Sequence, residues 1–341
     1  MGLDLKPLVE PIRIKFEELT NRVVAIDAYN AIYQFLAIIR GQQGEHLMDS
    51  SGKVTSHLSG LFYRSINFLS MGIKPIYVFD GKAPSLKYAE IERRRQVKRV
   101  ARVKYEQALQ EGRLEDARKY AQFTSVIQDY MIDDAKMLLD SLGIPHIDAP
   151  SEGEATAANL TINGTAYTSA SQDFDSLLFG ANRLVRNLTV SGRRKLPNKQ
   201  IYINVEPEII TLDQTLQTLR ISKEQFVDIG ILIGTDFNPD GFTGIGPKKA
   251  LKMIKEHGKL EEITDVKEKL NEIEYEKIRD VFLQPNVVNI ENPEFRDPDN
   301  NEIIQFLCKE RNFSVDRVSS ALQKMKKVSN SRSQTLEQWF S

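Results

Sequence analysis

Short runs of apolar, β-branched residues alternate along this chain with longer segments that place apolar side chains at helical spacing. The first two runs cover residues 22–27 and 75–80, and helical patterns cover residues 28–40 and 56–71. Strands that alternate with helices of ten or more residues are typical of βαβ units. We therefore expect an α/β fold with a mostly parallel central sheet and helices on both faces.

Acidic residues gather directly after the expected strands. The first two runs end in an aspartate, a third short strand at residues 144–147 leads into P-S-E-G-E-A, and residues 166–171 lead into Q-D-F-D. In sheets of this kind ligands bind at the carboxyl ends of the strands, so we expect these acids to share one edge. With one aspartate after the apolar run 231–235, the candidates are Asp27, Asp80, Glu152, Glu154, Asp173, Asp175 and Asp236.

Helix capping offers an ordinary explanation for each of these acids. Ser151 is a preferred N-cap residue, Glu154 stands three residues later as in a capping box, and acids in a first turn suit the helix macrodipole. Several carboxylates on one sheet edge, however, repel one another unless cations neutralise them. Two Mg²⁺ ions held by carboxylates can clamp the attacking and leaving oxygens of a phosphodiester. Both interpretations remain open at this point.

Composition narrows the class of protein and the kind of metal site. The chain has 341 residues, 41% of them hydrophobic, and no apolar run near the ~18 residues of a membrane span, so we expect a soluble, unexported protein with no membrane partner. The single cysteine, Cys308, excludes an internal disulfide framework and a cysteine-based zinc site, and its apolar helical context predicts a core position. The four histidines lack ligand spacing. The ligands of any metal must therefore be oxygens.

Charged residues are segregated along the chain, although the net charge is only −1. Basic residues dominate segments 87–104, 176–205 and 248–259, and this distribution favours nucleic-acid binding, against which the net charge alone argues. In the first segment the apolar positions form only a narrow stripe of Ile91, Val97, Val100 and Val103. A helix with so thin an apolar face packs weakly, either as an exposed helical hairpin or as an element that orders on binding.

Six short motifs follow one another along the chain: V-V-A-I-D-A, Y-V-F-D-G-K-A-P, A-P-S-E-G-E-A, S-Q-D-F-D-S-L-L-F-G, I-L-I-G-T-D-F-N and G-I-G-P-K-K-A. In this order and at these separations they resemble the flap endonucleases, structure-specific nucleases of the wider XPG and 5′-exonuclease family. The similarity covers nearly the whole chain. No single motif is specific, but their joint order is.

The resemblance implies a structure-specific 5′-flap endonuclease with additional 5′–3′ exonuclease activity. Such an enzyme hydrolyses a phosphodiester at the junction of single- and double-stranded DNA, leaves a 5′-phosphate, and acts in DNA replication and repair, including Okazaki fragment maturation. The resemblance also implies two Mg²⁺ ions per active site, with Mn²⁺ as a substitute. By its motifs, the first metal site corresponds to Asp27, Asp80, Glu152 and Glu154, and the second to Asp173, Asp175 and Asp236. The catalytic positions next to the scissile phosphate correspond to Lys87, Arg94 and Tyr33.

The resemblance further implies how branched DNA with a 5′ flap is held. A helical arch over residues 82–121 would pass the 5′ single strand along Arg93, Arg95 and Lys98. A helix–two-turn–helix element over residues 222–262 would hold the duplex backbone together with K⁺, through Gly244, Gly246, Lys248 and Lys249. These glycines precede Pro247 and independently predict a tight turn that opens a helix. Thr55 corresponds to a pocket for a 3′ flap.

We expect a single nuclease domain over residues 1–328 and a flexible tail over residues 329–341. Residues 333–341 resemble the motif that binds the ring-shaped sliding clamp of replication, with the motif's spacing kept by Leu336, Trp339 and Phe340. The motif's glutamine position holds Ser333, and Gln334 comes one residue later. The alternative is that the aromatic side chains dock on the protein's own domain. The lack of a basic extension is similar to archaeal-type members, so we expect a cytoplasmic monomer, with the nucleus as the alternative location.

Three other functions remain open. One is a plain 5′-exonuclease of the same family. Another is a haloacid-dehalogenase-like phosphatase, which also uses Asp-x-Asp after a strand, as at Asp173 and Asp175. The third is a non-catalytic scaffold that binds DNA and the clamp.

Overall fold

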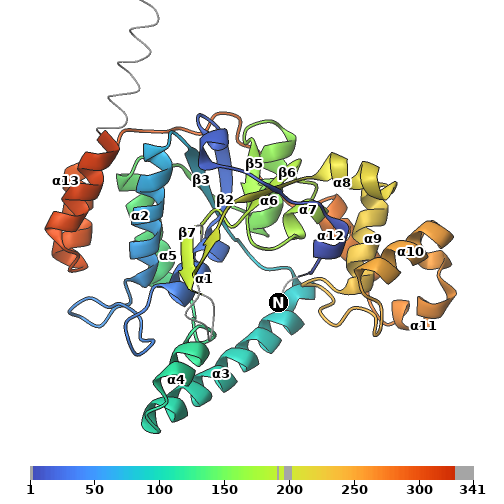
Figure 1. Cartoon of the computed structure of the whole chain (residues 1–341). Helices are drawn as coiled ribbons and strands as arrows, with labels where there is room; N and C mark the ends of the chain where they lie inside the picture. Colours follow the sequence, from blue (N-terminus) through green and yellow to red (C-terminus); the bar gives the residue numbers. More distant parts are fainter. Residues whose placement is uncertain (1–2, 190–191, 196–201, 327–341) are drawn as a thin grey trace, which may run out of the picture.

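Seven strands form the central sheet: β1 (Ile12–Arg13), β2 (Val23–Asp27), β3 (Lys74–Phe79), β4 (His146–Asp148), β5 (Thr168–Ala170), β6 (Arg183–Arg186) and β9 (Glu208–Thr211). The computed structural model describes residues 3–189, 192–195 and 202–326. The strand order is β1-β9-β6-β5-β2-β3-β4 (Figure 1). Strands β2 to β6 run parallel, whereas β9 is antiparallel to β6 and β1 to β9. The mostly parallel sheet predicted from the sequence is therefore confirmed.

The order of the strands determines where a ligand site can form. Among the parallel strands, the chain begins at β2 in the middle of the sheet, continues outward through β3 and β4, and then crosses to the other side of β2 for β5 and β6. Where the direction of winding changes, the loops after neighbouring strands separate and leave a crevice. This crevice lies at the carboxyl ends of β2 and β5.

Helices cover both faces of the sheet, as expected. One face carries α1 (Ala28–Ile38), α2 (Ser56–Ser70) and α5 (Asp129–Ser141), and the other carries α6 (Gly153–Ile162). Val24 and Ile26 of β2 pack with the first group, and Ala25 packs on the side of α6. Because successive side chains of a strand point to opposite faces, this alternation buries the strand on both sides.

The remaining helices and turns pack in two hydrophobic cores beside the sheet. A second core joins the N-terminal turn η1 (Lys6–Leu8) to α7 (Asp175–Leu178), α8 (Leu212–Leu219), α9 (Lys223–Ile233), α10 (Pro247–His257), η4 (Leu260–Glu262), η5 (Thr264–Val266), α11 (Lys267–Leu270) and α12 (Tyr275–Leu283). Near α2 and α5 lie η2 (Phe16–Leu19), α13 (Asn300–Ile304), its π-helical continuation η6 (Gln305–Glu310) and a helix over residues 315–326. Cys308 is buried there, as predicted. A separate hairpin pairs β7 (Gly192–Lys195) with β8 (Tyr202–Val205).

The segment that connects β3 to α5 forms a helical hairpin, which projects away from the rest of the molecule (Figure 1). It consists of a short turn, η3 (Ser85–Lys87), followed by α3 (Tyr88–Gln110) and α4 (Leu114–Ala121). The apolar stripe predicted on the first helix is not its packing face, because Val97, Val100 and Val103 are 52–60% exposed. Buried alanines line the contact instead: Ala101, Ala108, Ala117 and Ala121. Alanine loses no side-chain entropy when two helices come together, so this hairpin needs no larger apolar residues.

Two expectations concern the ends and surface of the chain. Within the described ranges, no helix is long and apolar enough to span a bilayer. The tail with Leu336, Trp339 and Phe340 lies outside the described residues. Its role, and the boundary between domain and tail at residue 328, stay predictions.

Candidate active site

A cleft of about 680 Å³ opens between the carboxyl edge of the sheet and the helical hairpin. Six of the seven candidate acids line it: Asp27, Asp80, Glu152, Glu154, Asp173 and Asp236. The seventh, Asp175, is the first residue of α7 and is buried close enough to Asp236 and Asp173 to be repelled by them. The structure thus brings together acids from five loops, as the strand pattern predicts. Their role as metal ligands stays a prediction.

Local backbone contacts fix the first two acids. Asp27 caps α1 by accepting a hydrogen bond from the backbone N–H of Asn30 at 2.9 Å. Asp80 accepts one from the N–H of Gly153 at 2.7 Å. A Cβ atom at position 153 would lie 2.7 Å from the Asp80 carboxylate, closer than real Cβ contacts. The glycine of the E-G-E motif therefore allows Asp80 to reach the start of α6.

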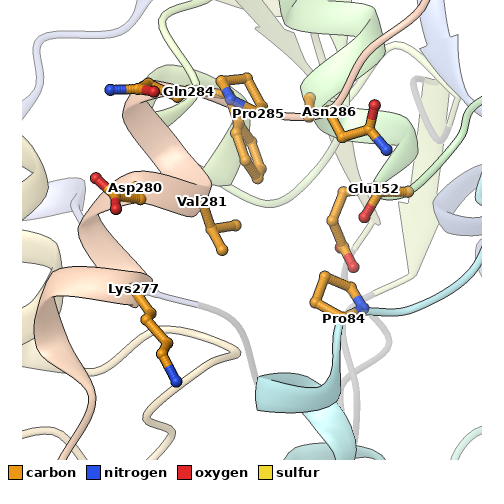
Figure 2. A pocket seen from close by; sticks show the side chains of 11 residues that line it. Pro84, Glu152, Lys277, Asp280, Val281, Gln284, Pro285 and Asn286 are labelled. Atoms are coloured by element: carbon orange, nitrogen blue, oxygen red, sulfur yellow. The ribbon is translucent and has the colours of Figure 1, made fainter.

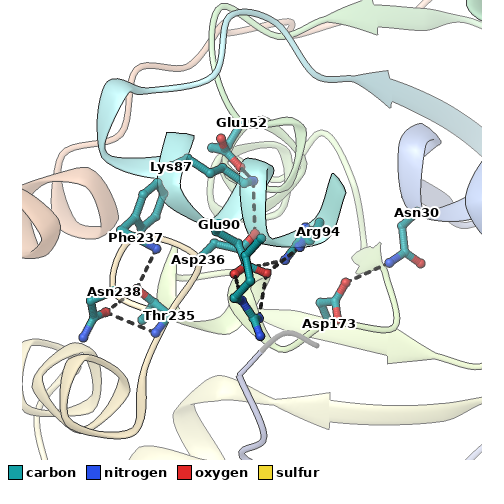
Figure 3. A network of polar contacts seen from close by, with 11 residues as sticks. Asn30, Lys87, Glu90, Arg94, Glu152, Asp173, Thr235, Asp236, Phe237 and Asn238 are labelled. Carbon is teal, nitrogen blue, oxygen red and sulfur yellow. Dashed lines mark hydrogen bonds and ion pairs between the residues drawn. The ribbon is translucent and has the colours of Figure 1, made fainter. Parts of the chain in front are cut away.

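The predicted capping box with Ser151 as the N-cap is wrong, although Glu154 does lie in the first turn of α6. The N-cap residue of α6 is Glu152, not Ser151, and its side chain makes no capping hydrogen bond. The Glu152 carboxylate instead accepts from the Lys87 ammonium at 2.5 Å (Figure 3). The elements that pack around Glu152, and not its neighbours in the sequence, therefore determine which group its carboxylate binds.

Two cations from the base of the hairpin reach into the cleft (Figure 3). The Lys87 ammonium lies 2.5 Å from Glu152 and 3.2 Å from Asp236. One Nη atom of Arg94 lies 2.5 Å from the other Asp236 oxygen. Burial lowers the pKa of Lys87, but the carboxylates of Glu152 and Asp236 more than offset this, so the pKa is raised and the ammonium stays charged.

The carboxylates are under strong mutual repulsion. Burial, and then neighbouring carboxylates, raise the pKa of Asp27, Glu154 and Asp175 well above the ordinary range of a carboxyl group. One carboxylate oxygen of Asp175 is buried without a hydrogen-bond partner. Such a group is costly unless it gains a cation or a donor.

This donor set fits hard divalent cations, because it supplies several charged oxygens and excess negative charge. Among the described residues, no three acidic, histidine or cysteine side chains converge on one point as they stand. Two of the carboxylates bind Lys87 and Arg94 instead.

Asn30 is a site residue that the sequence analysis missed. Its side-chain amide donates to Asp173 at 2.9 Å, and its amide oxygen accepts from the N–H of Gln172 at 3.3 Å. It thereby links the loops after β2 and β5 across the crevice. Its position three residues after Asp27, one turn into α1, was the available signal.

Residues predicted to contact DNA lie in different settings. Tyr33 borders the cleft, and the Lys98 ammonium lies 3.1 Å from its hydroxyl and 4.3 Å from its ring centre. Arg95 also lines the cleft, whereas the Arg93 side chain pairs with Glu90 outside the cleft lining. Thr55 is buried at the start of α2. We keep these DNA contacts as predictions.

The predicted helix–two-turn–helix element has the expected backbone. Gly244 has a positive φ of 77°, which favours glycine, and Gly246 is the N-cap of α10 with Pro247 at its first position. Lys248 and Lys249 are exposed in its first turn. Nearby, the Lys269 ammonium donates to the carbonyl of Gly241 at 2.5 Å.

A second cavity of about 340 Å³ lies on the other side of Glu152, next to α12 (Figure 2). Pro84, Val281 and Pro285 form much of its wall. Figure 2 shows the polar ends of Asp280 and Gln284 turned away from it. Glu152 therefore borders both cavities, but the other five acids that line the cleft do not line this second cavity.

Comparisons with known proteins agree with this geometry. The XPG N-terminal domain matches residues 1–101, and the XPG I-region matches residues 143–236. The chain is 58% identical to flap endonuclease 1 of Nitrosopumilus maritimus over 100% of both chains. It is 48% identical to flap endonuclease 1 of Pyrococcus horikoshii over 100% of this chain and 98% of the relative. The solved flap endonuclease-1 of Methanococcus jannaschii superposes with a TM-score of 0.75 at 37% identity, covering 97% of this chain and 100% of that one.

Proposed function

This chain belongs to the flap endonuclease family, and on that premise we propose that it cuts DNA in the cleft between the sheet and the arch formed by η3, α3 and α4. It is a structure-specific flap endonuclease, a metal-dependent enzyme that binds branched DNA and hydrolyses it. The observation that carries the proposal is the set of six carboxylates that line this cleft together with Lys87 and Arg94, with Asp175 buried beside them. The haloacid-dehalogenase-like phosphatase and the non-catalytic scaffold lose their support, because this family consists of DNA-cutting enzymes. A plain 5′-exonuclease remains the alternative.

The proposed cofactor is Mg²⁺, two ions per site, with Mn²⁺ as a substitute. Asp27, Asp80, Glu152 and Glu154 would hold one ion, and Asp173, Asp175 and Asp236 the other, some of them through water. When bound, the ions supply a hydroxide at neutral pH and neutralise charge on the phosphorus.

The protein's own cations then act on the phosphate. Lys87 and Arg94 now bind anionic oxygens of Glu152 and Asp236, and phosphoryl oxygens have the same chemistry. Exchange of one oxygen partner for the other would place two charge-assisted donors on the scissile phosphate. Tyr33 would stack on the adjacent base once Lys98 leaves its ring. The expected products carry a 5′-phosphate and a 3′-hydroxyl, and repeated cleavage at a 5′ end gives the exonuclease activity.

The rest of the molecule would hold the branched substrate. The first turn of α10, with Lys248, Lys249 and a K⁺ ion, would grip the duplex backbone without reading its sequence. Arg93, Arg95 and Lys98 of the arch would follow the 5′ strand, and the region of Thr55 would receive a 3′ flap. We further propose that the protein acts as a monomer and that its tail binds the sliding clamp.

The test is cleavage of an end-labelled double-flap DNA. Wild-type protein with Mg²⁺ should cut at or one nucleotide inside the junction, whereas wild-type protein in EDTA and Asp175→Asn with Mg²⁺ should bind the DNA and leave it intact. Asp213→Asn is the matched control, because Asp213 is an exposed first-turn acid of α8 as Asp175 is a buried one of α7. Cleavage in EDTA, or by Asp175→Asn at the wild-type rate, would refute the metal mechanism. Cleavage confined to a free 5′ end would favour the plain exonuclease.

A further inference from the structure

Glu90 is an unusual acid on the arch, because it is buried where its neighbours are exposed. Its side chain is 1% exposed, whereas that of Glu92 on the same helix is 58% exposed. Glu90 is the third residue of α3, a position where an exposed acid would already suit the helix macrodipole. Burial of a carboxylate costs free energy unless it is paired and hydrogen-bonded, so its partners must explain it.

Both partners of Glu90 are arginines, of which Figure 3 labels Arg94. Arg93 donates to the two carboxylate oxygens through Nε at 2.6 Å and Nη2 at 3.0 Å. Arg94 donates to one of these oxygens through Nε at 2.7 Å. Burial raises the pKa of Glu90, but these hydrogen bonds lower it further than burial raises it, so the carboxylate stays ionised. The group of three carries one negative and two positive charges and keeps a net positive charge.

The contact with Arg94 fixes the orientation of its guanidinium. The Nε–H is held by Glu90, and the neighbouring Nη2 on the same edge reaches Asp236 in the cleft at 2.5 Å. A planar guanidinium held at one edge has little freedom to rotate, and its two Nη groups form the edge that binds a phosphate bidentately. The Arg94 side chain is 41% exposed, so packing alone leaves it free to turn.

We infer that Glu90 is a positioning residue for the reaction, which holds Arg94 with its phosphate-binding edge toward the scissile phosphate. The inference rests on the proposed function, in which Arg94 contacts that phosphate. Glu90 itself touches neither DNA nor the metal-binding carboxylates in this role. Its removal should therefore slow the chemical step and leave DNA binding almost unchanged.

A double-mutant cycle tests this inference. Single-turnover cleavage of a double-flap DNA with Mg²⁺ and the Kd for the same DNA in EDTA would be measured for the wild type, Glu90→Gln, Arg94→Ala and the double variant. Arg94→Ala should cut on the order of 100-fold more slowly, as for loss of a transition-state donor. Glu90→Gln should cut on the order of 10-fold more slowly, as for loss of a partner that orients a functional side chain. The double variant should be no slower than Arg94→Ala, because Glu90 acts only through Arg94.

A matched control and a conservative variant separate this role from a structural one. Glu106→Gln removes an exposed acid that pairs with Arg102 four residues away on the same helix, and it should keep the wild-type rate. Glu90→Asp keeps the charge but shortens the side chain, so its rate should lie between those of the wild type and Glu90→Gln. If Glu90→Gln unfolds, as judged by its helical circular dichroism, the comparison of Glu90→Asp with the wild type carries the test.

The outcomes distinguish this inference from the proposed function. If Glu90→Gln slows cleavage by the same factor in the Arg94→Ala background as in the wild type, Glu90 acts independently of Arg94. Wild-type rates for Glu90→Gln, or for Glu90→Asp where the former unfolds, would overturn the positioning role while leaving the function intact. A wild-type rate for Arg94→Ala would instead remove the proposed role of Arg94, and the inference with it.

Discussion

Single residues in this protein combine a structural contact with a place in the cleft. Asp27 caps α1 and faces the acid cluster, and Asp80 holds the start of α6 from a neighbouring strand. These contacts fix where each carboxylate points before any cation arrives. Carboxylates that are already oriented need less reorganisation during catalysis, so the same hydrogen bonds that stabilise the helix ends also prepare the site.

His57 is a buried residue far from this chemistry that should govern acid stability. It is fully buried in α2, and neither ring nitrogen has a hydrogen-bond partner. Burial lowers its pKa from 6.5 to about 4, with a smaller opposing effect of Asp134 and smaller lowering effects of Arg311 and His46. Between these pH values the unfolded chain binds a proton that the folded protein does not. The contribution of His57 to the free energy of unfolding is therefore largest above pH 6.5 and decreases as the pH falls towards 4.

The slope from this one residue is at most about 1.4 kcal/mol per pH unit. Urea unfolding at several pH values from 7 to 4 would measure it. His57→Phe keeps an aromatic ring beside Tyr130 but cannot titrate, so its stability should fall less steeply than that of the wild type. His257→Phe, at an exposed histidine of α10, should follow the wild type. Parallel curves for His57→Phe and the wild type would show that His57 does not contribute.

At the scale of elements, one loop joins the chemistry to the grip on the duplex. The loop between α9 and α10 holds Asp236 near its start and leads into the first turn of α10. Gly241 has a positive φ of 47°, and a Cβ atom there would lie 2.1 Å from the carbonyl oxygen of Ile233. Lys269 of α11 donates to the Gly241 carbonyl and lies 5.5 Å from the Phe242 ring centre. The Lys269 ammonium, which belongs to another helix, therefore holds this loop in position.

We expect Lys269→Met to weaken binding of a duplex arm roughly tenfold, from loss of ~1.5 kcal/mol of a charge-assisted hydrogen bond. Lys267→Met, an exposed lysine two residues earlier on α11, is the control and should bind normally. Fluorescence anisotropy at several salt concentrations would measure both. If Lys269 only positions the loop, the dependence of binding on salt stays unchanged, whereas a lysine that binds a phosphate directly would, on removal, lower the slope by about one unit. Unchanged affinity would show that the loop needs no such support.

At the scale of the whole molecule, the arch, the edge of the sheet and the loop before α10 each contribute residues to the cleft. Lys87 and Arg94, which pair with acids of the cleft, come from the arch, and the acids come from the sheet and the α9–α10 loop. The tail with Leu336, Trp339 and Phe340 lies outside the described residues. Its predicted function is recruitment to a sliding clamp.

Deletion of residues 333–341 should leave cleavage of naked double-flap DNA unchanged and abolish its stimulation by the sliding clamp. Steady-state cleavage with and without the clamp would measure both effects. Replacement of the same residues by a Gly/Ser segment of equal length is the control for chain length and should behave like the deletion. Stimulation that survives the deletion would mean that another surface binds the clamp, and loss of basal cleavage would mean that the tail supports the nuclease domain.

The sequence alone determined the four central strands β2 to β5, the helices α1 and α2 that pack on them and the edge on which the acids lie, but not the strands β1, β6 and β9. Apolar residues at period two or at helical spacing are local signals, and the carboxyl ends of parallel strands must meet. The motifs that identified the family are also local, because each is a short stretch at or after a predicted strand or helix.

Only the tertiary structure decided which partner each charged side chain takes. Ser151 and Glu154 look like a capping box, but Glu152 binds Lys87, which lies 65 residues away in the sequence. Val97, Val100 and Val103 look like a packing stripe, but buried alanines form the contact. The burial of Glu90 has no local signature, and the position of Asn30 near Asp27 does not show that it binds Asp173. Burial and ion pairing depend on elements brought together from distant parts of the chain, and no short segment contains that information.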